Sequence, residues 1–179
     1  MGFTNSSLFF NHLRTWKISI LLLPFAIYFI FTRGTYTLID SADLIIHEAG
    51  HFVFMLFGNF IYMAGGTLMQ IIFPLFLAWY FLRNNYITGV QIFIFWLAQN
   101  LVNISVYAAD APIRKLRLLG GGKHDWYAML TQLGLLDYAD IIGVIFFLLA
   151  ILTFIFSLLI PLLSSSLSYG IKLSSEEAL

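Results

Sequence analysis

Three residues in the first third of the chain, His47, Glu48 and His51, have the types and the spacing of a metallo-hydrolase centre. Together they form the pattern H-E-x-x-H. If the apolar run from 44 to 57 is a helix, the two histidines lie four positions apart and face the same side. Two such imidazoles can share a zinc ion, and the Glu between them can act as general base on a zinc-bound water.

The surroundings of this pattern make it more informative than its five letters alone. An ionisable side chain at the centre of a bilayer costs about 2.5–3.5 kcal/mol on insertion scales, so such residues usually persist where they have a function. The segment 38–58 also contains Asp40 and Asp43. These two acids are explained either as helix-start residues that the helix dipole favours or as carboxylates that orient a metal-bound imidazole.

The composition is that of a membrane protein. Hydrophobic residues make up 60% of the 179 residues and charged residues 10%, against about 45–50% and about 25% in soluble domains. Most of the chain must therefore contact the lipid bilayer. The formal net charge is zero, which argues against a nucleic-acid partner because such proteins present a basic face. Cysteine is absent, so any metal must be bound by histidines and carboxylates.

Hydropathy predicts one all-α domain over residues 1–179, a polytopic membrane helix bundle with about five transmembrane helices. The predicted spans are 18–32, 38–58, 60–82, 88–109 and 141–163, and a polar loop covers 110–138. Gly65-Gly66 in the third span has two explanations. It is either a close-packing site within a helix or a re-entrant stretch whose backbone lines the site.

The distribution of positive charge predicts the orientation. With five spans and a cytoplasmic N-terminus, six Lys and Arg residues lie inside and three outside, as the positive-inside rule requires. Asp110, His124 and the inner half of the second span then lie toward the same leaflet. We expect an integral protein of a bacterial or archaeal inner membrane with its N-terminus in the cytoplasm.

A catalytic zinc needs three protein ligands and one open position, so His47 and His51 require a third partner. Asp110 and His124 are the candidates, and Asp125 beside His124 can orient it from the second shell of ligands. Further polar residues lie on the fourth span, where Asn100 and Asn103 share one helix face. They serve either as interhelical hydrogen-bonding groups or as substrate contacts.

The chain resembles the core of the site-2 intramembrane metalloproteases in three features. These are the helix pattern His47-Glu48-Ala49-Gly50-His51, a glycine-bearing third span, and an Asn-rich fourth span ending in Asp110. The resemblance covers roughly residues 38 to 112. It implies that an Asp on the last core helix completes the zinc site, preceded by an Asn. Asp110 would be that ligand, and Asn103 or Asn100 that Asn. The family's N-x-x-P-x-x-x-L-D-G lacks its Pro and final Gly here, so His124 stays open as the alternative.

The leading hypothesis is therefore a membrane-embedded zinc metallopeptidase with Glu48 as general base and a membrane or membrane-associated polypeptide as substrate. One alternative uses the same Zn²⁺ to hydrolyse a lipid amide or ester. Another is a non-catalytic membrane subunit that binds metal structurally or not at all. A di-iron desaturase is excluded because it needs about eight histidines, and the chain has four.

Overall fold

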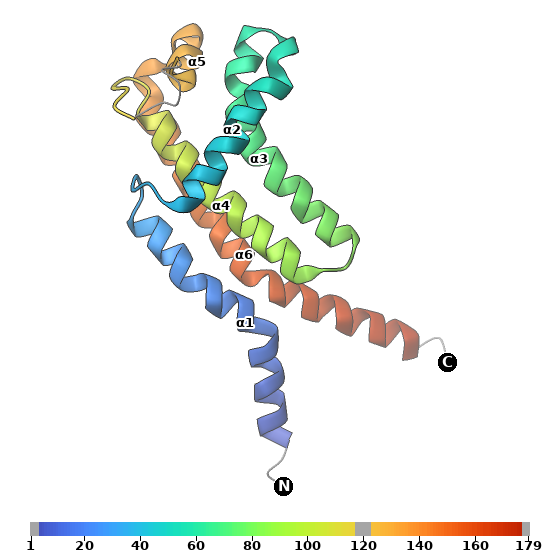
Figure 1. The fold of residues 1–179 in the computed structure, drawn as a ribbon. Helices are drawn as coiled ribbons and strands as arrows, with labels where there is room; N and C mark the ends of the chain where they lie inside the picture. The colour runs from blue at the N-terminus through green and yellow to red at the C-terminus, as the bar shows by residue number, and fades with distance from the viewer. Residues whose placement is uncertain (1–3, 117–122, 177–179) are drawn as a thin grey trace.

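A computed structural model describes the backbone of residues 4–116 and 123–176 and the side chains of 16–116 and 123–163. The described residues form helices and no strand, which confirms the all-α fold (Figure 1). The elements are α1 (Thr4–Phe31), α2 (Leu38–Phe54), η1 (Met55–Phe57), α3 (Asn59–Arg83), α4 (Ile87–Ala109), α5 (Asp125–Leu133), η3 (Leu136–Tyr138) and α6 (Ala139–Glu176).

Within the described part of the chain, three helical segments are long and apolar enough to cross a membrane: Asn59–Arg83, Ile87–Ala109 and Leu136–Leu163. A shorter apolar segment covers Trp16–Phe31. The predicted count of five spans is not confirmed. The second predicted span corresponds to α2, which has 17 residues and carries the Asp, Glu and His residues of the candidate site.

The helix α2 is amphipathic in the opposite sense to a soluble helix. Its buried residues are Asp40, Asp43, His47 and Gly50, which follow one another at helical spacing along one face. Large apolar side chains such as Ile45 and Phe52 are exposed on the other face. An apolar exterior around a polar interior is what a helix presents when lipid surrounds the bundle and its ionisable residues face inward.

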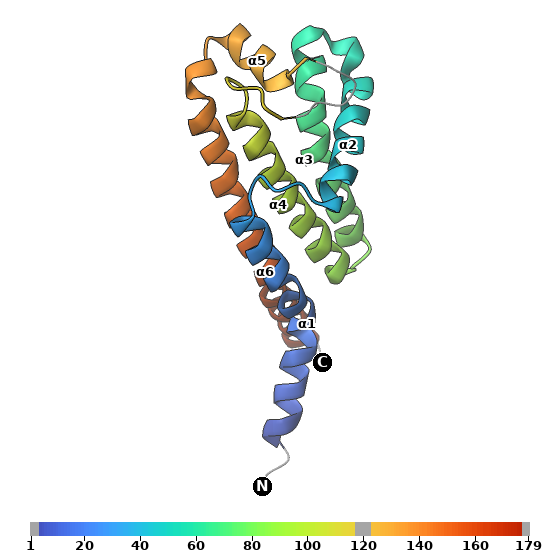
Figure 2. The ribbon, with the colours of Figure 1, turned by 60° about the vertical axis from the view of Figure 1, so that its left-hand side comes forward.

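The bundle is built around α4, which packs along α6 on one side and against α3 on the other, while α2 packs on α3. Figure 2 shows α1 lying across α6 and α4 at the end of the bundle away from α5. Three aromatic rings hold this part together. Phe95 of α4 lies 4.8 Å from Phe154 of α6 and 6.4 Å from Phe29 of α1, between ring centroids. These helices form a rigid apolar support for α2 and α3.

Two glycines allow α2 and α3 to cross at short distance. A Cβ atom at Gly50 would lie 2.2 Å from the carbonyl oxygen of Gly65, and one at Gly65 would lie 2.8 Å from the carbonyl oxygen of Gly50. Gly65 and Gly66 lie inside α3, which runs unbroken from Asn59 to Arg83. The re-entrant alternative is therefore wrong, and the close-packing explanation holds, because a helix leaves room for the neighbouring backbone only where side chains are missing.

The region predicted as a polar loop, 110–138, is partly helical. It contains α5 and η3, while the three consecutive glycines at 120–122 lie outside the described residues. In both ribbon views α5 lies at the end of the bundle where α2 ends and α3 begins (Figures 1 and 2). The first residue of α5 is thereby brought next to the His pair of α2.

Candidate metal centre

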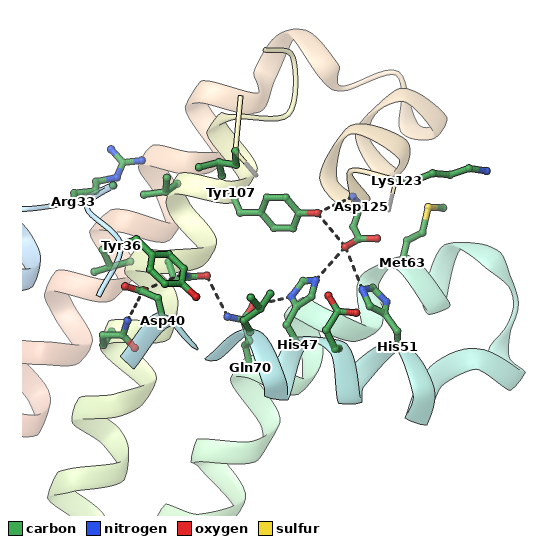
Figure 3. A pocket seen from close by; sticks show the side chains of 18 of the residues that line it. Arg33, Tyr36, Asp40, His47, His51, Met63, Gln70, Tyr107, Lys123 and Asp125 are labelled. Carbon is green, nitrogen blue, oxygen red and sulfur yellow. Dashed lines mark hydrogen bonds and ion pairs between the residues drawn. The ribbon is translucent and has the colours of Figure 1, made fainter. Parts of the chain in front are cut away.

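Three side chains converge on one point in the described structure: His47 and His51 of α2 and Asp125 of α5 (Figure 3). Asp125 Oδ2 lies 3.1 Å from His47 Nε2 and 3.3 Å from His51 Nε2. One ligand atom from each residue lies within 4.8 Å of the others. The side chains are 7%, 12% and 10% exposed in the same order, so the group is shielded on most sides.

Asp125 reaches this position because Tyr107 of α4 holds both ends of the residue. The Tyr107 hydroxyl donates to Asp125 Oδ2 at 3.1 Å, and the backbone N–H of Asp125 donates to the Tyr107 oxygen at 3.0 Å. His124 is the N-cap of α5, and its Nδ1 accepts from the Tyr127 N–H. The start of α5 is thus fixed in direction, and with it the carboxylate.

The outer ring nitrogens of the two histidines show which nitrogen carries the proton. His51 Nδ1 lies 2.8 Å from the Tyr62 carbonyl oxygen, and His47 Nδ1 lies 3.0 Å from Gln70 Oε1. A carbonyl oxygen only accepts hydrogen bonds, so each Nδ1 must donate. In a neutral ring each Nε2 then carries the lone pair and faces Asp125, which is the arrangement of metal-binding imidazoles with hydrogen-bonded outer nitrogens.

The donor set fits a divalent metal. Two imidazole nitrogens and a carboxylate oxygen meet at hydrogen-bond distance, so either a proton on an imidazole or a cation between the three groups must balance the buried carboxylate. Two His and one carboxylate form a familiar catalytic zinc set that leaves an open fourth position. Burial favours the neutral form of Asp125, but hydrogen bonds from His47 and His51 outweigh it and lower the pKa of Asp125 to about 2. The carboxylate is therefore ionised at neutral pH.

The three side chains lie at one side of a cavity of about 680 Å³. Glu48, the expected general base, also lines this cavity and is exposed to it. It lies on α2 between the two histidines. A water molecule in the cavity can therefore approach the metal position and the Glu48 carboxylate together.

Asp110 and His124, the candidates for the third ligand, lie against each other instead. The distance from His124 Nε2 to Asp110 Oδ2 is 3.4 Å. Both oxygens of Asp110 accept backbone N–H groups, from Lys115 and Leu116, each at 3.0 Å. Neither Asp110 nor His124 belongs to the metal-type group or lines the cavity.

The electronic state of His124 also differs from that of a ligand. Burial lowers the pKa of His124, against the opposite effect of Asp110, so the ring is neutral. Its Nδ1 lone pair accepts the Tyr127 N–H, which places the proton on Nε2 toward Asp110. No lone pair remains for a metal. The expectation of Asp110 or His124 as third ligand thus differs from the structure, where Asp125, expected only in a supporting role, reaches both histidines.

The two asparagines of α4 have separate surroundings. Asn100 is fully buried, and its amide donates to the Trp96 carbonyl within the same helix. Asn103 lines the cavity, donates to Asp40 Oδ1 at 3.1 Å and accepts from Gln70 Nε2 at 3.2 Å. Only Asn103 is therefore connected to the candidate centre.

Two residues of the centre were not singled out from the sequence. Gln70 follows Gly66 by four positions in an apolar helix, and both contact His47. Tyr107 follows Asn103 by four positions. In each case a polar side chain lies one helical turn beyond a residue already suspected, and that spacing on a common face is the signal that would have identified it.

Comparison with known proteins gives no relative: no family model, no curated protein and no solved structure matches the chain. The chemistry of the site therefore stands on its own residues.

Proposed function

We propose that this chain is a membrane-embedded, zinc-dependent hydrolase, and that it cleaves a membrane or membrane-associated polypeptide. The observation that carries the proposal is the convergence of His47 Nε2, His51 Nε2 and Asp125 Oδ2 beside a cavity that Glu48 also lines. The likeness to site-2 metalloproteases is retained in the H-E-x-x-H helix. It is altered in the third ligand, which comes from α5 rather than from the end of α4.

Each side chain has a distinct task in this scheme. His47, His51 and Asp125 would hold the metal, which would supply Lewis-acid activation of a water. Glu48 would accept a proton from water in the cavity and pass it to the leaving amine. Tyr107 keeps the Asp125 carboxylate directed at the two imidazoles through its hydroxyl. Removing the Glu48 carboxylate should stop hydrolysis without removing a ligand.

A polypeptide suits the cavity better than a lipid because of the amides along its wall. The side chains of Asn59 and Gln132 line it together with those of Gln99 and Asn103. Inside a membrane, a substrate backbone that leaves its helix needs protein partners for its N–H and C=O groups. The amides of Asn59 and Gln132 supply both donors and acceptors, whereas a lipid ester presents acceptors only and a lipid amide a single N–H.

The test uses the full chain in liposomes loaded with zinc, with total lipid extract and membrane peptides offered as substrates in parallel. Glu48→Gln should keep stoichiometric zinc and lose hydrolysis by at least about 100-fold, as expected for removal of a general base. His47→Ala should lose both zinc and activity. Asp140→Asn, an exposed acidic residue at the start of α6, is the matched control and should keep both.

Three results would contradict the proposal in different ways. Full activity in Glu48→Gln would remove Glu48 from the chemistry. Cleavage of lipid but not of peptide would replace the substrate class. Absence of bound zinc in the carefully purified wild-type chain would point to a non-catalytic membrane subunit.

A further inference from the structure

Four side chains form an unbroken line of hydrogen bonds that starts at the candidate metal ligand His47 and ends on its own helix. His47 Nδ1 contacts Gln70 Oε1 at 3.0 Å, Gln70 Nε2 donates to Asn103 Oδ1 at 3.2 Å, and Asn103 Nδ2 donates to Asp40 Oδ1 at 3.1 Å. The line passes from α2 to α3, then to α4, and returns to α2 two turns before His47. Figure 3 shows Asp40, Gln70 and His47 along it.

The direction of this line depends on its far end. A primary amide donates from one side and accepts from the other, so Gln70 and Asn103 could each be turned around. Asp40 fixes them because its carboxylate only accepts. Its Oδ2 receives the N–H and the hydroxyl of Thr37, and its Oδ1 receives amide groups of Gln99 and Asn103. The two oxygens of Asp40 thus face four hydrogen-bonding groups, three of which are N–H donors.

From this end the orientation of each group follows in turn. The Asn103 NH₂ must face Asp40, so its oxygen faces Gln70. The Gln70 NH₂ must then face Asn103, so its oxygen faces His47 Nδ1. That nitrogen must carry a proton, and Nε2, which lies 3.1 Å from Asp125 Oδ2, is the nitrogen left to bind a metal.

We propose that Asp40, Asn103 and Gln70 are positioning residues that impose the Nδ1–H tautomer on His47 and so make its Nε2 a metal ligand. The metal part of this inference rests on the proposed function. His51 needs no such device, because its Nδ1 donates to a backbone carbonyl, that of Tyr62, which cannot be turned around. His47 has only a side-chain amide as its partner.

Burial makes the arrangement effective. Asp40 is 7% exposed and Gln70 is 2% exposed, so a partner that turns away from either residue leaves a polar atom with little access to water. A buried polar group left without its partner costs about 1–3 kcal/mol. One reversed amide would create such a mismatch at both of its ends, and the line therefore changes direction as a whole or not at all.

The substitution Asp40→Asn reverses the line without changing its shape. The Thr37 N–H still requires an acceptor, so the oxygen of the new amide faces Thr37 and its NH₂ faces Gln99 and Asn103. The Gln99 Oε1 has no hydrogen-bond partner in the structure, so this oxygen can accept from the new amide if the Gln99 side chain turns. Asn103 and Gln70 must both turn, which places an NH₂ against His47 Nδ1 and moves the ring proton to Nε2.

The double substitution Asp40→Asn with Asn103→Asp should restore the wild-type direction. The carboxylate at 103 accepts from the amide at 40 on one side and from Gln70 on the other. The Gln70 oxygen then faces His47 Nδ1 again. If the network served only helix packing, the second substitution would lower stability further. If it sets the tautomer of His47, the second substitution should restore that tautomer.

The experiment measures zinc affinity by competition with a chromophoric chelator. The tautomer of His47 is read from ¹⁵N shifts of the metal-free chain carrying Asp125→Ala, which removes the competing acceptor at Nε2, at a pH where the ring is neutral. Asp40→Asn should weaken zinc binding by about 10–100-fold, as removal of outer-shell partners does elsewhere, and should move the ring proton to Nε2. The double variant should return both to wild-type behaviour. Asp140→Asn is the control, since Asp140 is an exposed acid at the start of α6 and takes no part in the line.

The outcomes separate this inference from the proposed function. If the wild type binds zinc and Asp40→Asn binds it equally well with an unchanged tautomer, the positioning role is wrong and the metal centre stands. If the wild type binds no zinc, the proposed function fails, and the ¹⁵N shifts still decide whether Asp40 sets the tautomer. Loss of zinc in both the single and the double variant, with unchanged thermal stability, also overturns the positioning role.

Discussion

The chain contains two histidine–carboxylate contacts with opposite characters, although they involve neighbouring residues. Asp125 faces His47 and His51, and the residue before it, His124, faces Asp110. Both contacts lie at the same end of the bundle. By residue type alone either could bind a metal.

The difference lies in what the remaining polar atoms do. In the His124–Asp110 pair, Nδ1 accepts from the backbone at the start of α5, and both carboxylate oxygens accept backbone N–H groups after α4. Each of these acceptor atoms receives a backbone N–H group near a helix end. The pair therefore stabilises the backbone around α5, and the imidazole offers no lone pair to a metal.

At the other contact the hydrogen bonds have the reverse effect. Those of His47 and His51 go through the outer nitrogen to acceptors on α3, so the two inner nitrogens converge on Asp125 and not on the backbone. The comparison teaches that a metal site is recognised less by its residue types than by which lone pairs the surroundings leave unused.

The largest expected effect separates the two carboxylates directly. Asp125→Asn should lower zinc affinity by more than about 100-fold, since loss of an outer-shell partner alone costs about 10–100-fold. Asp110→Asn removes one backbone-capping acceptor and should leave the zinc stoichiometry unchanged. Metal content after dialysis against a graded chelator series measures both. Zinc lost from Asp110→Asn and kept by Asp125→Asn would reverse the assignment of the two contacts.

A smaller effect on zinc affinity is expected from a substitution at Gly66 of α3, which packs against the His47 ring. A Cβ atom at Gly66 would lie 2.4 Å from the His47 ring, and one at Gly89 would lie 2.4 Å from the Phe81 ring. Each Gly→Ala change is an overpacking that costs about 1–3 kcal/mol. Gly66→Ala should also weaken zinc binding about tenfold, comparable to the loss of an orienting partner, because the ring must move away from Asp125.

Gly89→Ala is the matched control for this change, as it inserts the same methyl group against an aromatic ring far from the metal position in sequence. Thermal melts and zinc titrations of both variants decide the matter. Equal zinc affinity in the two would mean that the position of the His47 ring is not held by α3.

Part of the site was predictable because it is local. The four-residue spacing of His47 and His51 places them on one face of any helix, and the composition requires that face to be turned away from lipid. Both follow from short-range geometry. The same holds for the close contact at Gly65, which small residues in a membrane helix indicate.

The third member of the His–His–Asp group was not predictable in this way, because Asp125 is 78 positions from His47 in the chain. Its place depends on α5, a nine-residue helix within a region whose polarity indicated a loop. It also depends on Tyr107, which holds the start of that helix from α4. Charge counting directed Asp110 and His124 to the right end of the bundle, but it does not distinguish a lone pair that caps a helix from one that is free.

The smallest effect tests the capping role of His124. His124→Ala removes the acceptor for the Tyr127 N–H and should lower the free energy of unfolding by about 1 kcal/mol, as loss of an N-cap does. His124→Asn should recover most of that stability, because Asn is among the best N-cap residues. In both variants the zinc stoichiometry should stay at the wild-type value, since Tyr107 still holds Asp125. Zinc lost from both variants alike, with the cap restored in His124→Asn, would show instead that the imidazole of His124 itself takes part in binding the metal.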